Sequence, residues 1–328
     1  MFSKKSFIAL LGAAIILGIA TVGAYAWYLL QPMDQNNQTA TQFVIPKGQS
    51  ITTIGKRLEE AGLIKHGVVF RVVVTQKGLS GKIQAGSFDI SPSMTIEEIA
   101  LTLTQGTEDL WITILEGWRA EEIAEYLDAQ ELGSYDSEQF LHLVEQNDTE
   151  GQLFPDTYLI PRESTAQQIY TLLTNTFDAK VLDELQEEIS TSERPFDQVL
   201  IMASLVEREA RDFEQMRHVA GILWHRIELG MALQVDATLQ YSIGKKAGAT
   251  AWWVPPTAAD KATQSPFNTY LYPGLPPRPI SNPSLNAIKA ALDPLQVDDV
   301  FYLHAPSGDM YFAKTLDEHN VNINRYLR

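Results

Sequence analysis

The sequence lacks cysteine altogether and has few basic residues for its length of 328. The absence of cysteine excludes a disulfide framework, a thiolate metal site, an iron–sulfur cluster and a cysteine nucleophile. Lys and Arg number 25 against 41 Asp and Glu, which gives a formal net charge of −16. Proteins that bind nucleic acids need a cationic face toward the phosphates, so this charge argues against that class.

Several well-known catalytic motifs are also missing. The chain has no glycine-rich phosphate loop, no dinucleotide-binding G-x-G-x-x-G turn and no G-x-S-x-G nucleophile elbow. Its six histidines form no H-x-x-x-H or H-x-H pair, and no carboxylate spacing completes a zinc triad with them. We therefore expect neither a metal ion nor an organic cofactor.

The first 31 residues differ in composition from the rest of the chain. Residues 6–30 are 25 consecutive uncharged residues, and as a helix they would extend about 37 Å, enough to cross a hydrocarbon core of about 30 Å. Lys4 and Lys5 precede this run and no basic residue follows it until Lys47, so the positive-inside rule places the N-terminus in the cytoplasm. The sequence thus predicts residues 1–31 to be a cytoplasmic tip and a single-pass anchor in the cytoplasmic membrane, with the remainder on the extracytoplasmic side.

A cleaved signal peptide is the alternative interpretation of this segment. Ala24-Tyr25-Ala26 resembles a small-x-small cleavage site. An uncharged run of 25 residues is long for the apolar region of a signal peptide, which favours the retained anchor. Both interpretations export the protein.

The part of the chain after the anchor divides into a linker and two domains. Residues 32–41 are polar, contain a proline and lack periodicity, which is typical of a tether. Residues 42–109 combine short strands with amphipathic helices and predict a small α+β domain. Its expected elements are strands at 41–45 and 86–90 and helices at 51–61, 68–76 and 96–104. Residues 110–328 are expected to form a larger, mixed but helix-rich domain.

Residues 110–328 also predict a cleft. A strand at 111–115 and helices at 165–182 and 196–229 are expected to supply the scaffold. Many prolines fix extended backbone in the last hundred residues, at positions 255, 256, 276, 277, 279 and 283. Functional side chains concentrate on loops held by a rigid scaffold, so we expect these loops to form the wall of a cleft.

The most informative stretch is Val199–Val206 (VLIMASLV), which is apolar on every side except for Ser204 and is therefore expected to be a buried helix. It leads into Glu207-Arg208-Glu209. Either the helix emerges into water there, or one glutamate is held at the apolar wall of a cleft, where burial raises its pKa and leaves a proton to donate near neutral pH. Successive helix positions turn about 100°, so at most one of the two glutamates is expected to face a cleft. Periodicity does not choose between them.

A single protonated carboxyl suits acid-assisted cleavage of a glycosidic bond. Most enzymes of that kind need a second carboxylate as nucleophile or base, and Asp236 is the nearest candidate along the chain. Its alternative role is to cap the helix that is expected to begin near Ala237.

Several sequence blocks around these glutamates form a pattern along the chain. They are LFPDTYLIP (153–161), ASLVEREA (203–210), HRIELGMALQVDATLQY (225–241), SPFNTYLYPGLPPRPISNPS (265–284) and the final Phe312, Thr315 and His319-Asn320. Together they resemble the YceG-like family, the membrane-anchored endolytic murein transglycosylases (MltG proteins). The IPKG and AGSFDISPSMTIEEI segments of residues 42–109 look like the LysM-like domain of that family. One departure is Phe267, where many members carry Tyr.

The resemblance implies cleavage of the β-1,4 bond between N-acetylmuramic acid and N-acetylglucosamine within glycan strands, which leaves a 1,6-anhydromuramoyl end. In that family the sugar's own 6-hydroxyl attacks the anomeric carbon, so no second carboxylate is needed. The family's catalytic glutamate falls on Glu207, which would serve as both acid and base, with Glu209 as a supporting, substrate-side residue. Peptidoglycan strands are the expected substrate, and membrane-bound peptidoglycan synthases are the expected protein partners.

Six polar residues are expected to line the glycan cleft around Glu207. They interrupt loops near prolines, where stiff backbone can hold hydrogen-bonding groups toward sugar hydroxyls and acetamides. The set is Gln234, Asp236, Thr238, Asn268, Thr269 and Tyr270. A turn or cap role is the alternative for each of them. Two other functions stay open: a non-catalytic scaffold that binds peptidoglycan, and a hydrolytic muramidase in which Asp236 activates a water.

Overall fold

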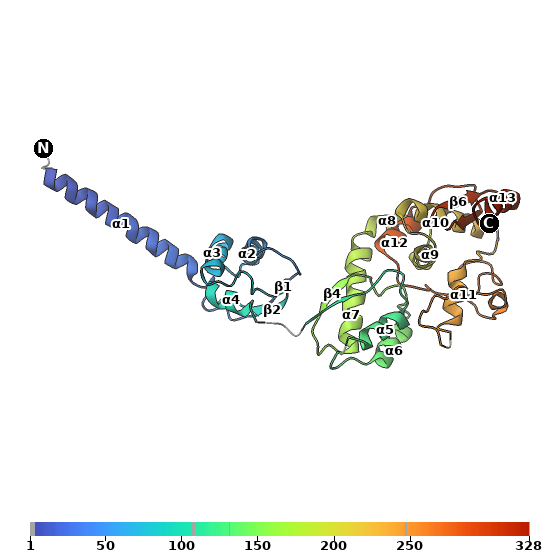
Figure 1. The fold of residues 1–328 in the computed structure, drawn as a ribbon, viewed down its shortest axis with the longest axis horizontal. Helices are drawn as coiled ribbons and strands as arrows, with labels where there is room; N and C mark the ends of the chain where they lie inside the picture. The colour runs from blue at the N-terminus through green and yellow to red at the C-terminus, as the bar shows by residue number, and fades with distance from the viewer. Residues whose placement is uncertain (1–3, 106–108, 131, 247, 328) are drawn as a thin grey trace. The chain divides into compact units, whose positions relative to one another are not determined.

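A computed structural model describes residues 4–105, 109–130, 132–246 and 248–327, with side chains described from residue 16 onward. The fold is a helix-rich α+β arrangement with small two-stranded sheets (Figure 1). The chain divides into two compact units, residues 1–110 and 111–328. Each unit has a hydrophobic core of its own.

The first unit begins with the long helix α1 (Lys4–Leu30), which covers the predicted anchor. From Ile16 to Tyr28 its large apolar side chains are exposed; Ile16 and Val22 are each 70% accessible to solvent. Among the residues with described side chains, no helix is both long enough and apolar enough to cross a membrane. The predicted anchor falls in part outside the described residues and stays a prediction.

The rest of the first unit is a strand–helix–helix–strand module followed by one more helix. Its elements are β1 (Thr41–Ile45), α2 (Ile51–Glu60), α3 (Gly67–Gln76), β2 (Gly86–Ile90) and α4 (Ile96–Thr102). The two strands pair antiparallel, with Thr41 opposite Ile90 and Ile45 opposite Gly86. Both strands have the bounds that the sequence predicts, and the helix ends differ from the predicted ones by one or two residues.

Two local features explain how α2 and α3 pack. The Ser50 side chain accepts a hydrogen bond from the Thr53 backbone N–H at 3.2 Å and so caps the start of α2. Gly55 of α2 faces Gly67 of α3, and a Cβ at Gly55 would lie 2.6 Å from the Gly67 carbonyl oxygen. Only glycine allows the two helices to approach this closely, so a side chain here would separate them.

The second unit is built from short strands and a larger set of helices. Two two-stranded sheets are present, β3 (Leu110–Thr113) with β4 (Thr157–Ile160) and β5 (Phe301–His304) with β6 (Met310–Ala313). The helices are α5 (Ala120–Asp128), α6 (Ser137–Asn147), α7 (Ala166–Phe177), a π-helical turn (Asp178–Asp183), α8 (Gln186–Thr191), α9 (Phe196–Glu209), α10 (Phe213–Glu228), α11 (Asp236–Ile243), a 3₁₀ turn (Asp260–Ala262), α12 (Leu285–Leu292) and α13 (Leu316–Tyr326).

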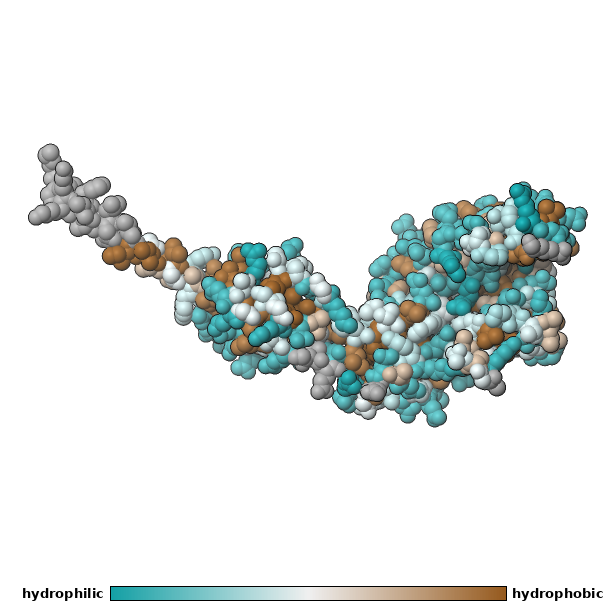
Figure 2. Space-filling view, viewed as in Figure 1, coloured by the Kyte–Doolittle hydropathy of each residue, from teal (hydrophilic) through white to brown (hydrophobic). Residues whose placement is uncertain are grey.

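The core of this unit surrounds α9, which packs against α10 and α12. All residues from Val199 to Val206 are buried, as the apolar run predicts. By contrast, the face of the second unit visible in Figure 2 is mostly hydrophilic, with small apolar patches. The burial of α9 fixes the position of the residues that end it.

The prediction of a single helix over residues 196–229 is wrong. The structure has two helices, because Ala210 adopts an extended conformation (φ −140°, ψ 160°) directly after α9. The Asp212 side chain then accepts a hydrogen bond from the Gln215 backbone N–H at 3.0 Å, which caps the start of α10. The break exposes the C-terminal end of α9 to a cavity.

Candidate active site

The end of α9 borders a cavity of about 750 Å³ in the second unit. Its lining includes Glu207, Arg208 and Glu209 from α9 and Asp236 from α11. The loop between β5 and β6 forms another part of the wall, from His304 to Gly308. A cavity of this size can bury a ligand as large as a sugar residue with its neighbours.

Both glutamates at the end of α9 line this cavity, so the expectation that at most one of them faces a cleft is wrong. Helical rotation separates their directions, but α9 ends at Glu209 and the chain continues in extended form at Ala210. No further helical turn shields this end, and the cavity therefore reaches both side chains.

Ser284 holds the Glu207 carboxyl with two hydrogen bonds. The backbone N–H and the side-chain hydroxyl of Ser284 both donate to Oε2 of Glu207, at 2.9 and 2.6 Å. Burial raises the pKa of the Glu207 carboxyl above its ordinary value, and the two hydrogen bonds from Ser284 oppose this rise. The nearby Glu116 carboxylate raises the pKa further, whereas Arg208 lowers it. The net effect is a carboxyl that keeps its proton to higher pH than an exposed glutamate does.

Glu209 occupies a second polar environment along the same cavity. Its Oε2 accepts a hydrogen bond from the Tyr302 hydroxyl at 3.0 Å, and its backbone carbonyl lies 2.6 Å from Nε2 of His304. Burial raises the pKa of the Glu209 carboxyl, and the Asp236 carboxylate adds to this rise. These contacts fasten the end of α9 to β5.

Arg208 lies between the two glutamates in sequence and turns toward the loop after β3. Its guanidinium lies 4.0 Å from the ring centroid of Trp253, and Nη1 donates to the Gly117 carbonyl at 3.3 Å. Gly117 has φ of +74°, and a Cβ there would lie 3.0 Å from Nη1 of Arg208. Glycine is therefore required at this position, since it allows the loop to approach the end of α9.

Of the six residues expected to line the glycan cleft, Asp236 lines the cavity and Tyr270 contacts Asp236. The Tyr270 hydroxyl donates to Oδ1 of Asp236 at 2.6 Å. Asp236 is the first residue of α11 rather than its cap, since Val235 occupies the cap position. Gln234 has φ of +53° and lies in the loop before α11, outside the cavity lining.

Three of the six residues are buried and hold the loops instead. Thr238 and Asn268 are both 0% exposed and Thr269 is 2% exposed. The Thr238 and Thr269 hydroxyls lie 2.9 Å apart, and the Val235 N–H donates to the Thr269 hydroxyl at 3.0 Å. Asn268 donates through Nδ2 to the carbonyls of two residues in its own loop. In this structure these side chains satisfy backbone groups, which is the alternative role that the sequence left open.

The sequence did not indicate three contacts that define the site: Ser284 on Glu207, Tyr302 on Glu209 and Gly117 near Arg208. Ser284 and Glu207 are 77 positions apart, and Tyr302 and Glu209 are 93 apart. Ser284 ends one of the blocks quoted above, which was the only signal available for it.

Glu150 is another buried carboxyl of the second unit, outside the lining of this cavity. Its side chain is 4% exposed and accepts hydrogen bonds from the Ala120 N–H and from Nδ2 of Asn282. Burial raises the pKa of this carboxyl to about 7. The Asn282 side chain also accepts from the backbone N–H groups of Gly151 and Leu153 through Oδ1, at 2.9 and 2.8 Å. Asn282 therefore ties the loop before α12 to the loop that contains Glu150.

We expect Glu150 to make the stability of the second unit dependent on pH. A carboxyl whose pKa rises from 4.5 to about 7 on folding contributes stability that is complete below pH 4.5 and is lost as pH rises to about 7. The loss is about 3 kcal/mol at most. Glu150→Gln keeps an acceptor oxygen and removes the charge, so it should raise the free energy of unfolding at pH 8 and leave it unchanged at pH 4. Urea unfolding at both pH values measures this, and an equal effect at both would contradict the assignment.

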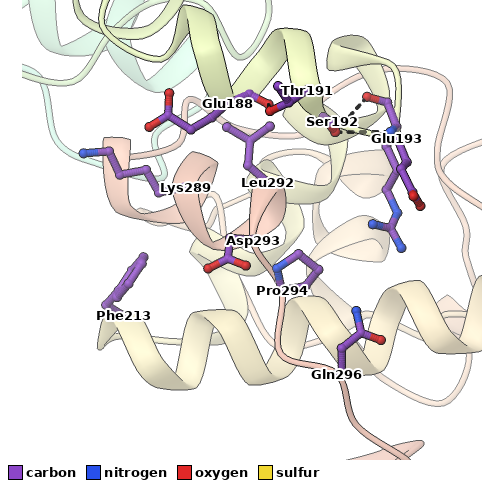
Figure 3. A pocket seen from close by; sticks show the side chains of 11 residues that line it. Glu188, Thr191, Ser192, Glu193, Phe213, Lys289, Leu292, Asp293, Pro294 and Gln296 are labelled. Atoms are coloured by element: carbon purple, nitrogen blue, oxygen red, sulfur yellow. Dashed lines mark hydrogen bonds between the residues drawn. The ribbon is translucent and has the colours of Figure 1, made fainter.

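Another cavity, of about 570 Å³, lies between α8, α10 and α12 (Figure 3). It is lined by Glu188 of α8, Phe213 of α10 and Lys289 of α12, among others. It shares no lining residue with the cavity at Glu207, and its residues lie outside the sequence blocks quoted above. The candidate active site is therefore the cavity at the end of α9.

Residues 43–325 match the model of the YceG-like family, and the chain belongs to that family. It is 29% identical over 330 residues to a Bacillus subtilis protein named endolytic murein transglycosylase, with 92% of this chain and 89% of the relative covered. A Streptococcus pneumoniae protein of the same name is 28% identical, with 94% of this chain but only 63% of the relative covered. A crystal structure of a YceG-like protein from Listeria monocytogenes aligns with a TM-score of 0.55 and 27% identity, covering 86% of this chain and 98% of that one.

Proposed function

We propose that this protein is an endolytic murein transglycosylase that cleaves the glycan strands of peptidoglycan, with Glu207 as its single general acid and base. The observation that carries the proposal is the position of Glu207: the last turn of a buried helix carries this carboxyl, which lines a cavity and has a raised pKa. General acid catalysis near neutral pH needs such a carboxyl. The names of the Bacillus and Streptococcus relatives supply the substrate class.

The proposed reaction needs only one carboxyl. Protonated Glu207 donates its proton to the glycosidic oxygen as the bond from that oxygen to the anomeric carbon breaks. The 6-hydroxyl of the same muramoyl residue then forms the new bond to the anomeric carbon, and its proton passes to the Glu207 carboxylate. The enzyme regains its starting protonation state, no water is consumed, and the product has a 1,6-anhydro end.

A hydrolytic muramidase is the second candidate, and the position of Asp236 favours it. Asp236 lines the same cavity as Glu207, so a second carboxylate is available to activate a water. Its Oδ1 already accepts the Tyr270 hydroxyl, however, and this bond opposes a role as a base. The two candidates differ in the chemical end that they leave on the product.

Incubation of the purified protein with cell-wall sacculi tests whether it is an enzyme at all. We expect soluble glycan fragments to be released, and release to stop when Glu207 is replaced by Gln. A protein that binds sacculi and releases nothing would instead be a non-catalytic scaffold.

We also propose that α1 anchors the protein in the cytoplasmic membrane, with the second unit on the extracytoplasmic side. The uncharged run of residues 6–30 and the exposed apolar side chains from Ile16 onward support this. The protein should then remain in the membrane fraction after a carbonate wash and keep its full N-terminus. A mature protein that begins at Trp27 would identify α1 as a cleaved signal peptide.

We further propose that the module of residues 42–109 is LysM-like and holds the enzyme against glycan. Its strand–helix–helix–strand order and its sequence support this role. Membrane-bound peptidoglycan synthases are the proposed protein partners, because an enzyme anchored in the same membrane would meet glycan strands as they are made.

A further inference from the structure

Ser284 is the N-cap of α12, and this position determines which hydrogen bonds its hydroxyl makes. It caps that helix by accepting a hydrogen bond from the Ala287 N–H at 3.2 Å. Its one proton is then available for Oε2 of Glu207, which lies 2.6 Å away. Ser284 is 3% exposed, so water does not compete for these positions. In the structure the hydroxyl accepts from Ala287 and donates to Oε2 of Glu207.

The two oxygens of Glu207 consequently differ. Oε2 accepts two hydrogen bonds from Ser284, one from the backbone N–H and one from the hydroxyl. Two donors occupy the two lone pairs of that oxygen, which leaves it no place for a proton. Within the described part of the chain, no hydrogen bond to Oε1 is found. A proton on Glu207 must then lie on Oε1.

The segment that carries Ser284 is fixed to the helix that carries Glu207. The Ile280 N–H donates to the Ser204 hydroxyl at 3.0 Å, and the Ser281 hydroxyl donates to the Ser204 carbonyl at 3.1 Å. Ser204 is the one polar residue in the apolar run of α9, and this contact explains its presence there. Ile280 and Ser281 are both 0% exposed. Ser284 and Glu207 are thus held at a fixed distance by contacts one helical turn away.

We propose that Ser284 is a positioning residue that directs the reactive proton of Glu207 to Oε1, the carboxyl oxygen that is free to reach a bound glycan. The inference rests on the proposed function of Glu207 as the acid. It goes beyond that function, because it states which oxygen transfers the proton and which residue determines this.

The Ser284 hydroxyl also stabilises the ionised form of Glu207, and its removal should therefore raise the pKa of this carboxyl. Such a substitution leaves the other titratable groups of the site unchanged. Glu116 and Arg208 act on Glu207, and Glu209, Arg211, Asp236 and His304 line the same cavity. If cleavage requires protonated Glu207, the alkaline limb of the pH profile follows its pKa. Loss of the hydroxyl should move that limb to higher pH and lower the maximal rate about twofold, because a proton that is no longer confined to one oxygen lies on the reactive one only part of the time.

Three variants of the full-length protein separate this role from helix capping. Ser284→Ala and Ser284→Gly both lack the hydroxyl, but glycine is nearly as good a cap as serine whereas alanine is not. Ser284→Thr keeps both the hydroxyl and the cap. The titration of the Glu207 carboxyl is followed by NMR of protein labelled with carbon-13 in the glutamate δ-carboxyl, and the signal is assigned by its loss in Glu207→Gln. Release of fragments from sacculi is measured in parallel across pH.

We expect the Ala and Gly variants to raise the titration midpoint of Glu207 by the same amount. Both should also shift the alkaline limb of the activity profile to the same extent. The Thr variant should have the wild-type midpoint and the wild-type limb. The proposal would be overturned by an unchanged midpoint in both variants. It would also be overturned if the loss of activity followed the loss of stability, so that the Ala variant lost more activity than the Gly variant. If the midpoint moves but the wild-type protein releases nothing from sacculi, the hydrogen-bond assignment stands and the transglycosylase function fails.

Discussion

Glu207→Gln should abolish the release of glycan fragments while the fold and glycan binding stay intact. A glutamine oxygen can still accept both hydrogen bonds that Ser284 donates to Oε2, so the side chain keeps its place. The amide cannot transfer a proton. General acid–base catalysis is commonly worth about 10²–10⁴ in rate, and the loss should reach or exceed the upper end because one group serves as both acid and base. Fragment release per unit time from sacculi measures the effect.

Glu209→Gln is the matched control for this substitution. Glu209 lines the same cavity and has a raised pKa from the same cause, burial, but its carboxyl is bonded to the Tyr302 hydroxyl. We expect a much smaller loss of activity, through a weaker hold of β5 on the end of α9. If Glu209→Gln is inactive and Glu207→Gln releases fragments at a normal rate, the acid has been assigned to the wrong glutamate.

Asn282→Ala should cause a large loss of stability in the second unit. The Asn282 side chain is 0% exposed and serves four partners: it accepts from the N–H groups of Gly151 and Leu153 and donates to the Trp118 carbonyl and to Glu150. Each buried group left without a partner costs about 1–3 kcal/mol. We expect the free energy of unfolding to fall by about 3–5 kcal/mol, since some partners will find water.

Urea unfolding followed by tryptophan fluorescence measures this loss, because five of the six tryptophans lie after residue 110. Asn147→Ala is the control. Asn147 is exposed, and its side chain donates to the Leu143 carbonyl of its own helix at 2.8 Å. Its replacement should change stability by less than about 0.5 kcal/mol. Equal effects of the two substitutions would show that Asn282 does not tie the loops together.

The sequence predicts the scaffold of the site well, because burial of α9 leaves a local signal. A run of eight apolar or small residues without helical periodicity predicts an element buried on all sides, and the structure confirms a buried helix there. The break after α9 is different. The residues from Ala210 to Asp212 continue an apparently helical pattern, and only the cap formed by Asp212 with Gln215 marks the start of a new helix.

The contacts within the site could be predicted less well. Polar residues in proline-rich loops are equally suited to bind a sugar and to satisfy the loop's own backbone, and the local sequence does not separate these roles. Thr238 and Thr269 turn out to pair with each other, whereas Asp236 lines the cavity. The partner of Glu207 comes from a segment 77 residues away, which no periodicity can indicate.

The most direct test of this account is the mass of the glycan ends that the wild-type protein releases from sacculi, with the digestion carried out in heavy-oxygen water. Attack by the sugar's own 6-hydroxyl predicts 1,6-anhydromuramoyl ends, which are lighter by one water than reducing ends and contain no heavy oxygen. Reducing ends labelled with one heavy oxygen would show that a water is the nucleophile. That result would contradict a single-carboxyl mechanism at Glu207 and identify the protein as a hydrolytic muramidase.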